Sequence, residues 1–457
     1  VSKKYEGLDG TELAISESQE RMAVLVENKD AEKFIKLAQE ENLEAIEVAK
    51  VTSNNRLTML WRGKNIVDIS RDFLDTNGVK QRIDIVVKNP NSHGYFKEKK
   101  CENIKTKWIE TLKDLNVCSQ RGLMEKFDSS IGAGTVFMPY GGKYYKSPIE
   151  SMCFKVPVLN GETKTGTIMA YGYNPKIGKW SPFHGAMYAV IESVTKVVAA
   201  GGNYKNIRLT FQEYFEKLGQ DSAKWGKPFA ALLGAFLVQK ELKIPAIGGK
   251  DSMSGTFKDI NVPPTLVSFA VDTVNTDKVI SPEFKKKGSR VVLIKTPKDK
   301  YNIPNFEELK KNYEVVHKLI NEGMVYASHT VTNGGIIEAV SKMTFGNKIG
   351  MNFSQNVKYE ELLNEDYGSI ILEIDNKVKL KEEFKDINYS LIGFTQGASL
   401  IKIGDEEIEI DELIKVWESP LEKVFPTKVE PIDKKIPLKL YDNKSKIGRA
   451  SCRERVY

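Results

Sequence analysis

A pattern of strands and helices occurs twice in the sequence, and this repeat constrains the fold more than any other feature. The apolar run at 21–27 precedes a helical stretch at 30–42, and strands are expected at 44–52, 56–62 and 64–69. The same order returns at 368–374 and 379–386, followed by further strand-like runs. These similarities indicate a diverged internal duplication. Because the second copy has much more chain before it, we expect this sequence to start inside the first copy.

The chain between the copies, roughly 95–276, has a different pattern. Strands are expected at 135–141, 151–159, 166–173 and 263–274, and a helix is expected at 185–202. A second helix is expected to begin with Pro228 in its first turn. The second copy begins near Ile280 with a strand at 289–296 and a helix from about 306 to 322, capped by Asn305. The mixture predicts an α+β protein.

Composition excludes several classes of function. The 457 residues are 41% hydrophobic and 28% charged, which is typical of a soluble globular protein. The longest apolar run, at 230–238, is too short to span a bilayer, and no secretory signal opens the chain. The four cysteines have no metal-ligand spacing, so we expect reduced thiols in the cytoplasm. The net charge is +7, but the basic residues are interleaved with acidic ones. This mild excess favours small anionic substrates over nucleic acid.

The C-terminal residues 447–457, IGRASCRERVY, differ in style from the Lys- and Ile-rich chain before them. They match the translation of a sequencing-adapter read-through, and we interpret them as an artefact. They contain three arginines and one glutamate, so the net charge without them is +5.

The stretch AIGGKDSMSG at 246–255 has two interpretations. It is not a Walker P-loop, because Ile244 stands where the first glycine is needed and Asp251 follows the lysine. Glycine N–H groups, Lys250 and the serine hydroxyls could nevertheless bind phosphate, and Asp251 could hold Mg²⁺. The alternative is a polar turn whose residues only satisfy backbone geometry.

Three further stretches carry chemistry-bearing residues. Glu192 and Lys196 lie one helical turn apart, either as a surface ion pair or as a carboxylate facing the metal of a nucleotide. SESQERM at 16–22 is a polar lead-in to a strand or a substrate site, and HTVTNGG at 329–335 is a capped turn or an anion site at a helix start. His184 is expected to be structural.

ISESQERMAV, WSPFHGA, IGGKDSMSGTF and TVTNGG, in this order, resemble the large form of phosphoribosylformylglycinamidine synthase over about residues 1–425. The resemblance implies tandem units like aminoimidazole ribotide synthetase, each an N-terminal and a C-terminal αβ domain, with the N-terminal domains pairing their sheets. It implies four segments: the end of the first-copy C-terminal domain at 1–90, the second-copy N-terminal domain at 95–276, the second-copy C-terminal domain at 277–425, and a linker at 426–446 before a glutaminase domain absent from this sequence.

The same resemblance implies a cytoplasmic ligase of purine biosynthesis. It would use ATP, Mg²⁺ and glutamine-derived ammonia to convert formylglycinamide ribonucleotide into the amidine, releasing ADP, phosphate and glutamate. By motif, the implied substrate-binding residues are Glu17, Ser18, Gln19 and Ser252. The implied phosphate- or nucleotide-binding residues are Gly249, Lys250, Asp251 and Thr332, and the implied metal ligands are Glu192 and Asp251.

Two positions depart from the family pattern. Thr330 stands where relatives often have a metal-binding aspartate, and Lys196 stands where some have asparagine, so metal binding at an auxiliary nucleotide site is in doubt. The family's catalytic histidine lies upstream, and no catalytic residue is assigned here. The alternatives are a non-catalytic nucleotide-binding scaffold half or another ATP-using synthetase of the same fold. Without the first N-terminal domain and a glutaminase, this chain alone is expected to be inactive.

Overall fold

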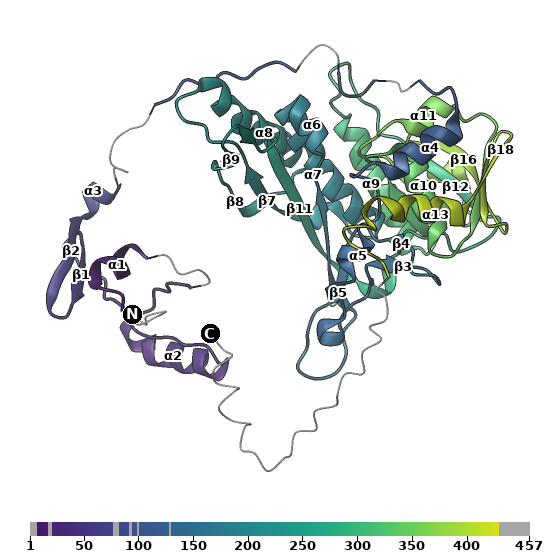
Figure 1. Cartoon of the computed structure of the whole chain (residues 1–457). Coiled ribbons are helices and arrows are strands. Elements are labelled where there is room, and N and C mark those ends of the chain that lie inside the picture. Colours follow the sequence, from purple (N-terminus) through teal and green to yellow (C-terminus); the bar gives the residue numbers. More distant parts are fainter. Residues whose placement is uncertain are drawn as a thin grey trace, which may run out of the picture. The chain divides into compact units, whose positions relative to one another are not determined.

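The computed structural model describes residues 7–16, 21–75, 82–90, 94–97, 100–127 and 129–428. It divides the chain into two compact units, Val1–Asp84 and Ile85–Tyr457 (Figure 1). Among the described helices, none has both the length and the apolar character needed to cross a membrane.

The first unit is built around a helix and a β-hairpin. Its elements are α1 Gly10–Ile15, the 3-10 turn η1 Asn28–Asp30, α2 Ala31–Glu40, β1 Arg56–Trp61, β2 Lys64–Ser70 and α3 Arg71–Asp75. Asp9 begins α1 through a capping box, in which its carboxylate accepts from the N–H of Glu12 and the Glu12 carboxylate accepts from the N–H of Asp9. Strands β1 and β2 pair antiparallel. The predicted hairpin and the helix before it are therefore confirmed.

The strands expected at 21–27 and 44–52 do not form. A strand needs a hydrogen-bonding neighbour, and within its described residues the first unit offers none to these two segments. Their counterparts in the second copy are strands that lie on either side of a third strand, with which both pair. Both segments have the apolar composition of strands, but among the described residues the pairing that makes a strand is missing.

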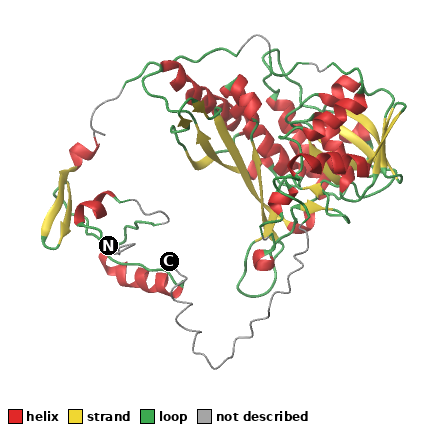
Figure 2. Cartoon of the chain, viewed as in Figure 1, coloured by secondary structure: helices red, strands yellow, loops and turns green. Residues whose placement is uncertain are grey.

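The second unit contains two large sheets with helices between and outside them (Figure 2), and two two-stranded pairs, β3-β4 and β9-β10. Its helices are α4 Ile104–Lys113, α5 Arg121–Met124, α6 Pro175–Trp180, α7 Pro182–Ala199, α8 Ser222–Leu242, α9 Phe306–Asn321, α10 Gly335–Phe345, α11 Tyr359–Leu363, α12 Leu380–Glu383 and α13 Ile410–Glu418. Short 3-10 turns occur at η2 Ile131–Ala133, η3 Tyr204–Asn206, η4 Thr276–Lys278 and η5 Ser419–Leu421.

The strands up to residue 275 include a five-stranded sheet of order β5-β6-β11-β7-β8. These strands are β3 Tyr140–Gly141, β4 Ser147–Pro148, β5 Met152–Lys155, β6 Thr165–Gly172, β7 Arg208–Tyr214, β8 Ala246–Lys250, β9 Thr256–Phe257, β10 Ile260–Asn261 and β11 Thr265–Asn275. All neighbours in this sheet are antiparallel except β7 and β8, which run parallel. Strand β8 is thus an edge strand.

A seven-stranded sheet follows, of order β13-β15-β12-β16-β14-β17-β18. Its strands are β12 Arg290–Ile294, β13 Val325–Thr330, β14 Gly350–Phe353, β15 Ile370–Ile374, β16 Tyr389–Gln396, β17 Leu400–Ile403 and β18 Glu406–Glu409. Alternate residues of β12 enter two different cores: Val292 and Ile294 pack with α7 and α9, whereas Val291 and Leu293 pack with α4, α10 and α13. The sheet is therefore covered by helices on both faces.

Helix α7 begins at Pro182, three residues before the predicted start at 185, and is buried around its circumference. Ser181 caps it by accepting from the N–H of His184, and Pro182 occupies the first turn, where its missing N–H costs nothing. The next helix, α8, begins six residues before the predicted Pro228, because the Asp221 carboxylate caps the N–H groups of Ala223 and Lys224. The expectation that Pro228 starts this helix is therefore wrong, since the proline lies inside it.

Helix α4 packs in the core of the seven-stranded sheet, although the sequence analysis placed it in the preceding domain. Trp108 is fully buried there, and its indole N–H donates to the Ser341 hydroxyl on α10 at 2.7 Å. A contact 233 residues distant along the chain leaves no local signal, so the sequence pattern did not reveal it.

We expect Trp108→Ala to lower the free energy of unfolding of the second unit by about 3–5 kcal/mol, because it removes a large buried side chain and leaves a cavity. The neighbouring Lys107→Ala, whose side chain is exposed and pairs with Glu110, should change it by less than about 0.5 kcal/mol. Urea denaturation followed by fluorescence and circular dichroism measures both. Equal, small effects would show that α4 is not part of this core.

Candidate functional site

The stretch 246–255 forms the edge strand β8 and the turn that follows it. Parallel pairing places Gly249 beside Phe211 and Lys250 beside Gln212 of β7. A Cβ atom on Gly249 would lie 2.3 Å from the carbonyl oxygen of Phe211, whereas one on Gly248 would meet nothing within 4 Å. Glycine at 249 is therefore required for the two backbones to approach.

Beyond β8 the backbone continues to follow the end of β7. The N–H of Ser252 donates to the Glu213 carbonyl at 3.1 Å, and the N–H of Phe215 donates to the Ser252 carbonyl at 2.9 Å. The hydroxyls of Ser252 and Ser254 are 2.8 Å apart. These contacts hold the serines in one place, so a purely flexible loop does not describe this turn.

The charged side chains of this turn are exposed. The ammonium of Lys250 donates to the Asp251 backbone carbonyl at 2.7 Å and, among the described residues, forms no ion pair. The half-buried Glu213 lies near enough to Asp251 to be affected by its charge: burial, and then the negative charge of Asp251, raise the pKa of the Glu213 carboxyl. A cation and two neighbouring carboxylates therefore face solvent beside a glycine-rich edge.

Glu192 lies in a very different environment on α7. Glu192 is 6% exposed. One of its carboxylate oxygens accepts from the Lys196 ammonium at 2.6 Å, and the other accepts from the N–H of Tyr173 at 3.1 Å. Lys196 also donates to the Tyr171 carbonyl at 3.1 Å and lies 4.9 Å from the centre of that ring. The surface ion-pair interpretation of Glu192 and Lys196 is thereby excluded, since the pair is buried.

The protonation state of this pair follows from its surroundings. Burial by itself would lower the pKa of Lys196, but the negative charge of Glu192, with smaller effects from Tyr171 and Glu150, raises it above its ordinary value. Lys196 therefore remains an ammonium ion inside the protein.

Glu150 connects Thr330 with the site of Glu192 and Lys196. Glu150 was not among the residues predicted from the sequence. The N–H of Thr330 donates to one Glu150 oxygen at 2.8 Å, and the Thr330 hydroxyl donates to the other. The imidazole of His329 lies 3.5 Å from the same carboxylate. A lone carboxylate immediately before the apolar strand β5 was the available signal, but only the fold shows that it faces the end of β13.

Thr332 lies in the turn between β13 and α10. Its carbonyl accepts from the N–H of Gly335 at 3.0 Å, and Gly334 and Gly335 have φ of 103° and 74°, which other residues rarely adopt. The helix start has no side-chain cap, so the first N–H groups of α10 are oriented as in an anion site. Among the described residues, no hydrogen bond or ion pair connects Thr332 with Lys250 or Glu192.

Glu17, Ser18 and Gln19 lie outside the described residues, so their predicted role is not examined by the structure. His184 has both ring nitrogens occupied, by the Ser181 hydroxyl at 2.8 Å and the Tyr301 carbonyl at 2.9 Å. Burial lowers its pKa. These contacts suit the structural role predicted for it.

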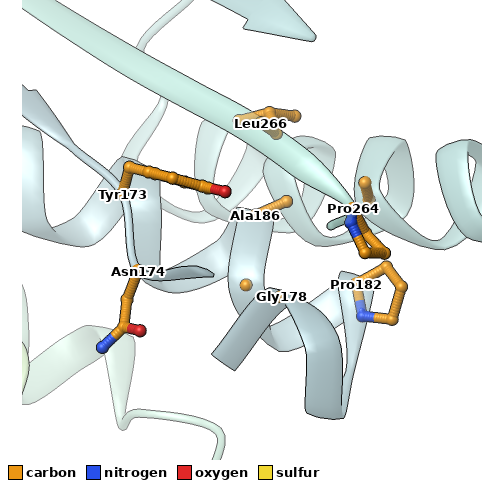
Figure 3. Close-up of a pocket in the computed structure, with 9 residues that line it drawn as sticks. Tyr173, Asn174, Gly178, Pro182, Ala186, Pro264 and Leu266 are labelled. Carbon is orange, nitrogen blue, oxygen red and sulfur yellow. The ribbon is translucent and has the colours of Figure 1, made fainter. Parts of the chain in front are cut away.

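A small pocket lies between α6, α7 and β11, close to Tyr173 (Figure 3). Its empty volume is about 200 Å³, below the ~300–1,000 Å³ typical of sites for small molecules. The Asn174 amide, which lines this pocket, already donates a hydrogen bond to the Tyr367 hydroxyl at 2.7 Å. This pocket is too small to be the nucleotide site.

The two predicted metal positions differ in their fit to Mg²⁺. Among the described residues, no group of three or more His, Cys, Asp or Glu side chains is arranged to hold a metal. Mg²⁺ is commonly held by one or two carboxylates plus substrate phosphates, so Asp251 with Glu213 fits it. Glu192 does not fit, because both its oxygens are occupied and the Lys196 ammonium would repel a second cation at this distance.

The chain resembles known proteins both in sequence and in fold. Residues 1–62 match the family model "AIR synthase related protein, C-terminal domain". Among solved structures, PurL of Thermotoga maritima complexed with ATP aligns with a TM-score of 0.56 at 20% identity, over 86% of this chain and 57% of that one. The complex with ADP aligns at 0.57 and 19% identity, covering 86% and 58%. The chain thus has the α+β fold of the AIR synthase-related proteins.

Within that class, curated relatives that align over nine tenths of the chain share one name. Phosphoribosylformylglycinamidine synthase subunit PurL of Thermoplasma volcanium is 24% identical over 467 residues, which is 92% of this chain and 58% of the relative. The same subunit from Thermus thermophilus is 24% identical over 93% of this chain and 60% of the relative. The resemblance predicted from the motifs is confirmed, and the chain spans somewhat under two thirds of the length of these relatives.

We expect Gly249→Ala to lower the melting temperature of the second unit and to disorder β8, because its Cβ would collide with the Phe211 carbonyl. Gly248→Ala is the matched control, since it adds the same methyl group into open space one residue away. Calorimetry gives the melting temperatures, and hydrogen exchange of residues 246–250 reports the strand. If the two variants behave alike, the close approach of β7 and β8 is not required.

Proposed function

We propose that this chain is a synthetase portion of an ATP-dependent ligase that converts formylglycinamide ribonucleotide into formylglycinamidine ribonucleotide in purine biosynthesis. The observation that carries the proposal is the turn at Gly249–Ser252, where the exposed Lys250 ammonium has no ionic partner among the described residues and a glycine and a serine hydroxyl lie in the same short stretch. Relatives that align over nine tenths of the chain are named for this activity. The nitrogen would come as ammonia from a glutaminase partner.

The residues of the turn have distinct roles in this proposal. Gly249 lets the backbone approach a phosphate, and the Lys250 ammonium neutralises negative charge on the transferred phosphoryl group. The Ser252 hydroxyl donates a hydrogen bond to the substrate. Asp251, with Glu213 beside it, would hold Mg²⁺, which would supply positive charge to neutralise the phosphates.

Thr332 is proposed to bind phosphate at the start of α10. The uncapped helix N-terminus supplies oriented N–H groups, and the Thr332 hydroxyl adds one further donor. Because no contact connects this turn with Lys250 among the described residues, we assign it to a separate phosphate position.

The face of the five-stranded sheet opposite α7 supports a partner domain. Met152 and Met169 are paired across β5 and β6 and are 39% and 36% exposed, and Tyr171 beside them is 54% exposed. An apolar sheet face of this kind is covered when a second sheet packs on it. We propose a sheet of the same type as the partner, as the resemblance implies.

We expect Lys250→Ala to weaken binding of Mg²⁺–ATP or of formylglycinamide ribonucleotide about tenfold or more, the usual effect of losing a hydrogen bond to a charged group. Lys240→Ala, an exposed lysine on α8, is the control and should bind as the unaltered chain does. Isothermal titration calorimetry measures both ligands. Unchanged affinity for both in a folded Lys250→Ala would contradict the role given to Gly249–Ser252.

Gln19→Ala tests the second motif. In an assembled enzyme with its glutaminase, it should raise the KM for the ribonucleotide more than the KM for glutamine, because Gln19 is proposed to contact only the ribonucleotide. Steady-state kinetics with each substrate varied in turn gives the two values. An effect confined to glutamine would assign the motif to ammonia delivery instead.

A further inference from the structure

The buried carboxylate of Glu192 and the partly buried carboxylate of Glu150 lie near one cationic group, and that group belongs to the chain itself. Lys196 contacts Glu192 at 2.6 Å, and it lines one pocket together with Glu150. We propose that Lys196 serves as a tethered cation at this junction, in the place where a bound metal ion would otherwise be required, so that the junction is independent of metal. This inference does not depend on the function proposed for Lys250.

The contacts of the ammonium are those of an ion held in a built site. Its side chain is 11% exposed and that of Glu192 is 8% exposed. It donates to a carboxylate oxygen and to the Tyr171 carbonyl, and it lies near the face of the Tyr171 ring. A carboxylate, a backbone carbonyl and an aromatic face are all favourable neighbours of a cation.

The site joins parts of both sheets. Tyr171 belongs to β6 of the five-stranded sheet, and Thr330 ends β13 of the seven-stranded sheet. Glu150 accepts two hydrogen bonds from Thr330 and faces the same pocket as Lys196. Without the Lys196 ammonium, the Glu192 and Glu150 carboxylates would lie near one another with no cation between them. Their repulsion would then favour separation of α7 from the segment that carries Glu150.

A divalent ion cannot simply be added to this arrangement. Mg²⁺ requires close to octahedral oxygen coordination at about 2.0–2.1 Å. The Glu192 oxygens are already hydrogen-bonded by Lys196 and by the Tyr173 N–H, and the Glu150 oxygens by Thr330. The ammonium can use the same oxygens at ordinary hydrogen-bond distances, and its tether on α7 keeps its local concentration high without any free ion.

Melting temperature in the presence of different cations tests the proposal. An Asp251→Asn chain, which lacks the carboxylate proposed above to hold Mg²⁺, should melt at the same temperature in EDTA and in millimolar Mg²⁺. Lys196→Ala should melt about 5 °C or more below the unaltered chain, because it leaves a buried charge unpaired. Propylammonium, which replaces the lost amine and stem, should restore much of the difference by occupying the cavity that the truncation itself leaves.

Two control variants separate charge from bulk. Lys196→Met keeps most of the stem without the charge, so it should be destabilised but should not respond to propylammonium. Lys205→Ala removes a lysine that is 60% exposed and pairs with Glu314, and it should change the melting temperature by less than about 1 °C.

Three results would overturn the proposal: a melting temperature of the Asp251→Asn chain that falls in EDTA and returns with Mg²⁺, a Lys196→Ala chain as stable as the unaltered one, or equal rescue of Lys196→Met. If Lys196→Ala does not fold, Mn²⁺ binding followed by electron paramagnetic resonance decides the question. Glu192→Gln should bind as many Mn²⁺ ions as the unaltered chain, and loss of one ion would show a metal at Glu192. Asp251→Asn reports separately on the metal of the proposed active site.

Discussion

The burial of α7 on all sides is the constraint on which the second unit depends. This helix packs on the five-stranded sheet, on α8, and through the same core on residues of the seven-stranded sheet. The approach is close because glycines line it: a Cβ on Gly172 of β6 would lie 2.1 Å from the Ala189 carbonyl, and one on Gly234 of α8 would lie 2.0 Å from the Phe183 carbonyl. Such contacts leave little freedom in the relative position of helix and sheet, so packing fixes where the backbone of Glu192 lies, and hydrogen bonds from Lys196 and Tyr173 orient its carboxylate.

Local signals in the sequence predicted many of the elements of this structure. The apolar face of α9 and its Asn305 cap, the apolar body of α7, and the apolar runs of β12 and β15 each contain their own evidence. Predictions failed where the decisive partner is distant. The segments at 21–27 and 44–52 have a strand-like composition, but among the described residues they have no neighbour to pair with. Helix α8 begins at an aspartate cap that the more obvious proline concealed.

The candidate site shows the same division. The glycines, lysine and aspartate of 246–251 could be selected by residue type, but their position on an edge strand parallel to β7 could not. Glu192 and Lys196 could be paired by their spacing, whereas their burial, and the link through Glu150 to Thr330, needed the tertiary structure. Sequence reasoning identified the chemistry available to each residue, and the fold decided which residues share a location and which cation can exist beside a given carboxylate.

The complete burial of α7 has a consequence for how this protein can diverge. An inserted or deleted residue rotates all that follows in a helix by about 100°. In α7, an insertion before Glu192 would turn Glu192 and Lys196 away from Tyr171 and Tyr173, and no solvent-facing side exists where the displaced charges could be hydrated. Length variation is therefore excluded from residues 182–199, and natural insertions should gather instead in the exposed loop at 156–164. Substitutions of similar volume remain the only route by which this helix can change.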